Sequence, residues 1–278
     1  MEAYENGFKL PASQLLKKLE NVSIRHLTLE DEDNSMHHLL SVMVDRSDMN
    51  DIAGLMQLDL GMLSGHKWPW KQTNTSKFYT TAVVTFTRLH TLRLGKACLD
   101  QMNVPDEHGK LDVDYFIQSI PKWQRLRTLQ LPGLGLTAKD ARDILIACSD
   151  CLSLKNLSLS DNFLQNLHEV VLKQDVKCHL QTLNLSNNSF GVFDDYVVTC
   201  EALQALLSQY TSLSALDLSN NSFSPCHGPA IESVLGTCTH LKELDLSDNS
   251  FSAAVGHDIS HDIRTAWVGL EPDFLLRR

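Results

Sequence analysis

Four copies of one short pattern constrain this chain more than any other feature of its sequence. The clearest copy, LSALDLSNNSF, covers residues 213–223, and close variants cover residues 180–190, 241–251 and 154–164. All four fit L-x-x-L-x-L-x-x-N-x-L, and three of them carry Phe at the last position. A pattern that returns at this spacing is typical of stacked units that share one continuous core.

The letters of the pattern predict a strand followed by a turn. In the L-x-L segment, Leu216 and Leu218 face one side and Asp217 faces the other, because side chains alternate along a strand. An Asn then ends each strand, where its amide can satisfy backbone groups as the chain turns off the sheet. These residues are Asn162, Asn188, Asn221 and Asn249.

Fainter copies precede these four. Two of them keep every Leu and lose the Asn, and two more keep only the apolar spacing. The eight copies begin at Ile24, Leu55, Leu89, Leu126, Leu154, Leu180, Leu213 and Leu241. Successive starts are therefore 26 residues (154 to 180) to 37 residues (89 to 126) apart.

Helical patterns lie between the later copies, with apolar residues spaced i, i+3, i+4 and i+7. The four stripes begin at Val113, Ala141, Leu203 and Ile231. Thr137-x-x-Asp140 predicts a capping box at the start of the second helix. Each helix therefore lays an apolar stripe against the predicted sheet.

Strand, turn and helix in units of this length resemble the leucine-rich repeat, in the long-repeat subtype of ribonuclease inhibitor. The resemblance covers residues 24–251. It implies an α/β solenoid of about eight repeats, shaped as an arc or horseshoe, with parallel strands on the concave side and helices on the convex side. We call the strand side of the sheet, opposite the helices, the strand face.

The segments outside the repeats are assigned as caps. Residues 1–23 are predicted to hold a short amphipathic capping helix that includes Leu15, Leu16 and Leu19. Residues 61–88 fit the repeat worst and are predicted to be an irregular insertion. Residues 252–278 are predicted to form a C-terminal capping helix and a short mobile tail.

Composition excludes several classes of protein. The formal net charge of −10 disfavours a nucleic-acid binder and an anionic membrane surface. No apolar run approaches the roughly 20 residues of a membrane span. Seven cysteines at irregular spacing predict no disulfide framework, and the N-terminus lacks the pattern of a secretory signal. We therefore expect a cytoplasmic protein.

No catalytic motif is present, so the sequence predicts a non-enzymatic binder without cofactor or metal. Cys148-x-x-Cys151 lacks two further zinc ligands at suitable spacing, and Cys148 occupies an apolar helix position, which favours a buried thiol. His257 and His261 share a predicted helix face that we expect to be exposed, and we interpret them as solvated rather than as metal ligands.

The strand face is the predicted binding surface for a protein partner. Its basic residues gather in the middle of the array and its acidic residues at the C-terminal end, a polarity suited to electrostatic steering. The candidate residues are Arg93, Lys96, Arg127, Lys155, Asn184, Asp217, Glu243 and Asp245. The basic group predicts a partner with an acidic patch. An ordinary solvated surface is the alternative interpretation.

Trp68 and Trp70 flank Pro69 in the irregular insertion and are a second candidate surface. Either they cover the core edge of a degenerate repeat, or they anchor a partner, since Trp is enriched at binding hot spots.

A small acidic chain made almost wholly of repeats resembles the leucine-rich-repeat effectors that intracellular bacteria such as Legionella inject into host cells. That resemblance implies a virulence role in the host cytosol. Two alternatives are a GTPase activator similar to the Ran-activating leucine-rich-repeat proteins, whose long acidic tail this chain lacks, and a ubiquitin-ligase adaptor, which requires an F-box before the repeats.

Overall fold

The structure of the 278-residue chain is a computed structural model. It describes residues 2–5, 8–11, 26–28, 57–60, 88–95, 113–171, 179–193, 196–228, 231, 241–250 and 275–277. The chain divides into two compact units, Met1–Gly135 and Leu136–Arg278, and each unit is described by itself.

The first unit contains a hairpin and four parallel strands. The hairpin pairs β1 (Glu2–Glu5) with β2 (Phe8–Pro11) in antiparallel register. The parallel strands follow one another in chain order and are β3 (His26–Thr28), β4 (Gln57–Leu60), β5 (Thr91–Leu94) and β6 (Thr128–Gln130). Helix α5 (Val113–Ser119) and the 3-10 turn η1 (Ile120–Lys122) lie between β5 and β6 in sequence.

The core of the first unit forms where the pattern predicts it. Leu92 and Leu129 are fully buried and are neighbours through the register of β5 and β6. Trp123 is also fully buried, and its ring meets Phe116 of α5 edge-on at a centroid distance of 5.6 Å. This contact fixes α5 to the segment that follows η1 and leads into β6.

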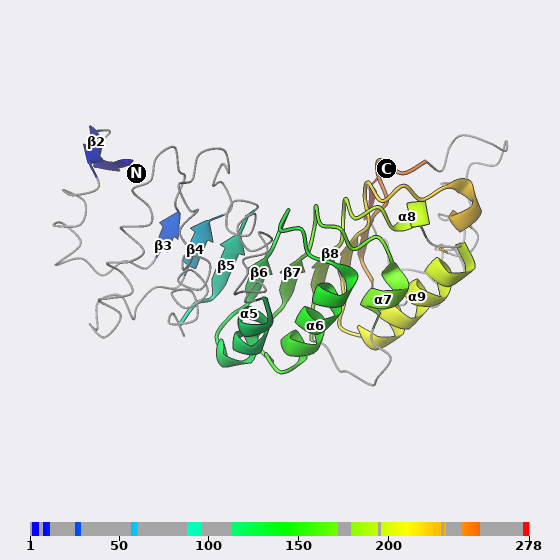
Figure 1. Cartoon of the computed structure of the whole chain (residues 1–278), viewed down its shortest axis with the longest axis horizontal. Helices are drawn as coiled ribbons and strands as arrows, with labels where there is room; N and C mark the ends of the chain where they lie inside the picture. The colour runs from blue at the N-terminus through cyan, green and yellow to red at the C-terminus, as the bar shows by residue number, and fades with distance from the viewer. Residues whose placement is uncertain are drawn as a thin grey trace, which may run out of the picture. The chain divides into compact units, whose positions relative to one another are not determined.

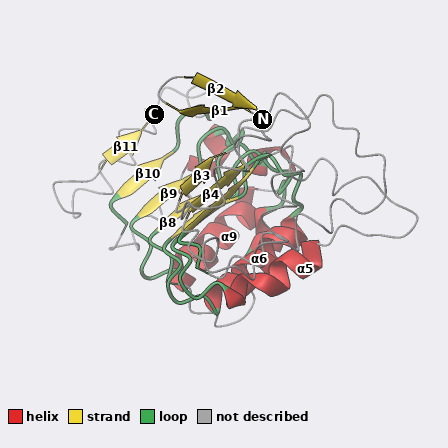
Figure 2. Ribbon diagram, turned by 90° about the vertical axis from the view of Figure 1, so that its left-hand side faces the viewer, coloured by secondary structure: helices red, strands yellow, loops and turns green. Residues whose placement is uncertain are grey.

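The second unit carries five parallel strands, again in chain order, of which β7 and β8 are labelled in Figure 1 and β8 to β11 in Figure 2. They are β7 (Asn156–Ser158), β8 (Thr182–Asn184), β9 (Ala215–Asp217), β10 (Glu243–Asp245) and β11 (Leu275–Arg277). The helical segments are α6 (Ala138–Ser149), α7 (Leu167–Val170), α8 (Phe190–Phe193), α9 (Tyr196–Gln209) and the 3-10 turn η2 (Pro225–His227).

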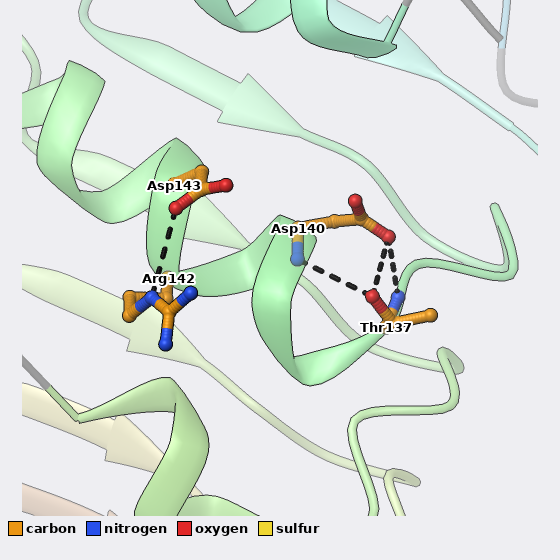
Figure 3. A network of polar contacts seen from close by, with 4 residues as sticks. All are labelled: Thr137, Asp140, Arg142 and Asp143. Carbon is orange, nitrogen blue, oxygen red and sulfur yellow. Dashed lines mark hydrogen bonds and ion pairs between the residues drawn. The ribbon is translucent and has the colours of Figure 1, made fainter. Parts of the chain in front are cut away.

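Helix α6 begins at the predicted capping box, shown in Figure 3. Thr137 Oγ1 accepts a hydrogen bond from Asp140 N–H at 3.3 Å, and the Asp140 carboxylate accepts from Thr137 N–H at 2.9 Å. These bonds satisfy two backbone donors at the start of the helix that no helical carbonyl could reach. Further along the same helix, Arg142 Nε lies 3.6 Å from the carboxylate of Asp143.

The leucines of the pattern form the core of the second unit. Leu183, Leu185, Leu216, Leu218, Leu244 and Leu246 are between 0% and 6% exposed, which confirms the predicted register of the strands. Figure 2 shows α6 and α9 on one side of strands β8 to β10. The apolar stripes predicted for these helices are buried, among them Ile144, Leu145, Leu203 and Leu206.

Two terminal segments differ from the predictions. The tail was predicted to be mobile, and Leu275–Arg277 pairs in parallel with β10, a strand that the repeat pattern did not predict. An edge strand presents backbone donors and acceptors, which an adjacent segment of chain can satisfy. Residues 2–5 and 8–11 form a hairpin that no pattern predicted.

Several predicted features lie outside the described residues. They are the capping helix at Leu15, Leu16 and Leu19, the insertion of residues 61–88 apart from Arg88, and the C-terminal capping helix. Of the helical stripe that begins at Ile231, only Ile231 itself is among the described residues, and its side chain is buried.

Candidate partner-binding surface

The strand face of the second unit is built from the residues that alternate with the buried leucines. Strands β7, β8 and β9 share one burial pattern, in which a buried leucine lies between two half-buried residues. The outward positions form two columns across the sheet. The first is Asn156, Thr182, Ala215 and Glu243, and the second is Ser158, Asn184, Asp217 and Asp245.

The second column is held in place by a serine two residues further along each strand. Asp217 Oδ1 accepts from the backbone N–H of Ser219 at 3.0 Å and from its hydroxyl at 2.7 Å. The same pair of bonds joins Asn184 to Ser186 and Asp245 to Ser247. These bonds fix the side chains against the backbone before any partner arrives.

Side chains also bond from strand to strand within the columns. Asn184 Nδ2 donates to Asp217 Oδ2 at 2.9 Å, and Thr182 Oγ1 donates to Asn156 Oδ1 at 2.8 Å. The strand face between β7 and β9 is therefore a connected polar surface with defined side-chain positions.

A buried ladder of asparagines supports this surface from the turns. Asn188 is fully buried, and its Nδ2 donates to the carbonyls of Leu159, Leu185 and Ser186, each at 3.0 Å. Its backbone N–H in turn donates to Oδ1 of Asn221 at 2.9 Å. The amide thus satisfies backbone groups at the turn, as the pattern predicted, and it also ties its own turn to the turn before it, which the pattern did not predict.

The turn residue before each ladder asparagine adopts a left-handed backbone and points outward. Asp161, Asn187, Asn220 and Asp248 have φ between 50° and 59°. Asn220 Nδ2 donates to Asn187 Oδ1 at 3.1 Å, and Asn187 Nδ2 donates to Asp161 Oδ1 at 2.5 Å. Asp and Asn tolerate this conformation better than other residues with a Cβ, which explains the recurrence of SDN and SNN.

Charge changes along the strand face of the second unit. Lys155, at its N-terminal end, is half-buried, and its Nζ lies 3.5 Å from the carbonyl of His179. Glu243 and Asp248, at the C-terminal end, are exposed, and Asp245 is half-buried. The predicted acidic group is thus brought together on adjacent strands.

The predicted basic group is divided between the two units. Arg93 and Arg127 belong to the first unit, and Lys155 belongs to the second. Arg127 is exposed, whereas Arg93 is half-buried with its Nε enclosed. Clustering of the three residues stays a prediction, and Lys96, Trp68 and Trp70 lie outside the described residues.

The two cysteines of the CxxC pair are buried, Cys148 at 4% and Cys151 at 1% exposure. In the described part of the chain, no three His, Cys, Asp or Glu side chains are grouped so as to hold a metal. His257 and His261 lie outside that part. Among the described helices, none is long and apolar enough to cross a bilayer.

Comparisons with known proteins agree with the repeat pattern. Residues 179–199 and residues 237–254 each match a family model described as a leucine-rich repeat. The chain therefore contains leucine-rich repeats, and domains built from such repeats generally mediate protein–protein interaction.

Two of the solved structures that match this chain illustrate the similarity. A leucine-rich-repeat-containing protein of Legionella pneumophila, LegL7, aligns with a TM-score of 0.54 at 15% identity, over 88% of this chain and 72% of that one. The tropomodulin C-terminal domain of Caenorhabditis elegans aligns with a TM-score of 0.41 at 14% identity, over 56% of this chain and 90% of that one. The first of these similarities shows a shared fold.

Proposed function

We propose that this chain is a non-enzymatic scaffold that binds a protein partner on its strand face. The observation that carries the proposal is the prearranged polar surface of the second unit. Asn184, Asp217 and Asp245 lie in one register column, and serines hold each of them in place. Binding to a prearranged surface costs less side-chain entropy than ordering flexible residues, so such a surface favours affinity.

The bonds of Asn184 and Asp217 also decide which side chains of the surface are available to a partner. Asp217 Oδ2 and Asn184 Nδ2 are bonded to each other, so these groups shape the surface rather than reach for a ligand. The exposed side chains around them, such as Gln181, Lys242 and Glu243, are placed to make the contacts. Arg127 and Lys155 would steer a partner with an acidic patch.

A charge reversal tests the proposal against a matched control. Wild type, Lys155→Glu on the strand face and Lys139→Glu on the exposed side of α6 are used to capture proteins from host-cell lysate, with quantitative mass spectrometry. The expected result is a partner that Lys155→Glu loses and Lys139→Glu retains. With the purified partner, the affinity should fall by at least about tenfold, or about 1.4 kcal/mol.

The opposite result contradicts the strand-face assignment. A partner lost on Lys139→Glu and kept on Lys155→Glu would place the interface on the helices. A Trp68→Ala, Trp70→Ala pair that abolishes capture while Lys155→Glu does nothing would place it on residues 61–88. Capture of a Ran-type GTPase or of ubiquitin-ligase subunits would favour the corresponding alternative function.

We further propose that the scaffold acts as a bacterial effector in a host cytosol. Support comes from the small, acidic, repeat-rich chain and its net charge of −10. A translocation reporter fused to the N-terminus and expressed in Legionella during infection should enter host cells in a secretion-dependent way. Entry that also occurs in a secretion-deficient strain, or no entry in either strain, would contradict the effector role.

A further inference from the structure

The edge of β10 that faces away from β9 is paired with the short strand β11, and it carries backbone donors and acidic side chains. Residues 275–277 pair in parallel with β10, matching Glu243 to Leu275, Leu244 to Leu276 and Asp245 to Arg277. Leu275 follows Glu243 by 32 residues (275 minus 243), and Glu243 follows Ala215 by 28 (243 minus 215). Strand β11 thus arrives at the spacing of a further repeat.

By its sequence, this additional repeat is poorly anchored. The register aligns Leu276 with Leu244, which is one of the three leucine positions of the pattern. The other two positions, held by Leu241 and Leu246 in the preceding copy, correspond to Asp273 and Arg278. A strand with one apolar anchor in three gains much less from burial than β8, β9 or β10.

The turn after β10 also offers donors that no described residue of β11 meets. In the preceding copy, the backbone N–H groups of Leu218, Asn220 and Asn221 donate to Asp245 O, Ser247 O and Asn249 Oδ1. The equivalent donors of the next copy belong to Leu246, Asp248 and Asn249. The paired residues of β11 align with residues 243–245 only, and no described residue accepts from the N–H of Asp248 or Asn249.

Charge selects what this edge would bind. The outward column changes from Ser158 and Asn184 to Asp217 and Asp245 as the edge is approached, and Glu243 and Asp248 add exposed carboxylates. The register partner that the chain itself supplies for Asp245 is Arg277. An arriving strand is therefore favoured if it carries a basic residue at that position.

We propose that the edge of β10 is a docking site for an extended basic segment of a partner protein, and that β11 occupies it in cis as a displaceable strand. The partner segment runs parallel to β10, with an apolar residue aligned with Leu244 and Arg or Lys aligned with Asp245. A segment that continues past this register supplies acceptors for Asp248 and Asn249 N–H, so it competes successfully with β11.

The test uses the full chain and a fluorescent peptide with the sequence of residues 271–278, EPDFLLRR. Wild type should bind it weakly, because β11 already occupies the edge. Leu276→Pro in the full chain replaces the leucine of β11 that aligns with Leu244 and fixes φ away from the strand value, so it should weaken β11 and bind the peptide at least about tenfold more tightly. Asp245→Asn keeps the oxygen that accepts from Ser247 but removes the negative charge. When it is added to Leu276→Pro, the peptide should bind more weakly. A peptide with Glu in place of Arg277 should also bind Leu276→Pro more weakly.

Hydrogen exchange checks that the variant is folded. In Leu276→Pro, the amide of Leu244, which faces β11, should exchange faster, while those of Leu183 and Leu216 stay protected. If all three of these amides lose protection, the Leu276→Pro variant is not folded, and Arg277→Glu in the full chain takes its place in the same peptide-binding comparison. Equal peptide affinity for wild type and a folded variant would overturn the proposal, as would binding that Asp245→Asn leaves unchanged. A wild-type dimer that the peptide dissociates would assign the edge to a second copy and overturn the partner assignment.

Discussion

The asparagine ladder makes a prediction whose magnitude follows from its contacts, and Asn221→Ala is the sharpest perturbation of it. Asn221 is fully buried. Its Oδ1 accepts from Asn188 N–H at 2.9 Å, and its Nδ2 donates to the carbonyls of Leu185 at 3.0 Å and Leu218 at 3.1 Å. Alanine removes all of these bonds, and water cannot replace them at a buried site.

Two contributions add up to the expected loss. The orphaned N–H of Asn188 costs about 1–3 kcal/mol, and each lost Nδ2 bond costs about 0.5–1.5 kcal/mol. We expect the free energy of unfolding to fall by about 2–5 kcal/mol, allowing for partial relaxation of the turn. Asn221→Asp keeps the acceptor and removes the donor, and places a carboxylate against carbonyl oxygens, so it should destabilise at least as much.

Asn220→Gly is the matched control, one residue away. The Asn220 side chain is exposed, and its bond to Asn187 Oδ1 is 3.1 Å long. Glycine accepts its φ of 50° without strain, so the control should change stability by less than about 1 kcal/mol. Urea melts followed by circular dichroism measure all three variants. Equal losses for Asn221→Ala and Asn220→Gly would refute the structural role of the ladder.

Three further substitutions test the packing of the second unit. Leu216→Ala should cost about 2–5 kcal/mol of unfolding free energy, because Leu216 is 3% exposed, and a loss below about half a kilocalorie in urea melts would contradict the register. Gly191→Ala should lower the melting temperature, because a Cβ at this position would lie 2.3 Å from the carbonyl oxygen of Ser222. The same change stabilises most helices, so an unchanged or higher melting temperature would contradict the close approach. Thr137→Ala should cost about 1 kcal/mol through loss of the capping box, and Thr137→Ser should restore most of it; equal losses would show that the hydroxyl is not the capping group.

The sequence predicts the parts of this fold that the leucine spacing controls. Leu183, Leu216 and Leu244 align across three parallel strands because burial fixes register when one face of a sheet is covered. Helix α6 follows equally from its stripe of Ala141, Ile144 and Leu145. Both signals are periodic, and periodic burial is what a single sequence records most clearly.

The same reasoning missed β11 and the hairpin of β1 and β2. Strand β11 keeps one leucine of three, so its place depends on backbone bonds to β10 rather than on apolar spacing. Residues 2–11 show no alternation that distinguishes a strand from a loop. A strand that forms because it pairs with the edge of a neighbouring strand does not need a pattern of apolar residues in its own sequence.

The candidate surface was predicted as positions but not as a network. Asn184, Asp217 and Asp245 were assigned to a partner from their outward alternation alone. The serines at 186, 219 and 247 each donate a backbone N–H and a hydroxyl to these side chains. The repeated D-L-S and N-L-S triplets were the signal that could have revealed it, because Asp and Asn bond the residue two positions on.

Site-specific photo-crosslinking tests the central claim most directly, because it needs no prior identity for the partner. A photoreactive amino acid replaces Gln181 on the strand face in one variant and Gln204 on the outer side of α9 in another, both exposed positions of the second unit. After irradiation in host-cell lysate, the account predicts one protein crosslinked from position 181 and absent from position 204. The same protein crosslinked from position 204 and not from position 181 would contradict the claim that the strand face binds the partner.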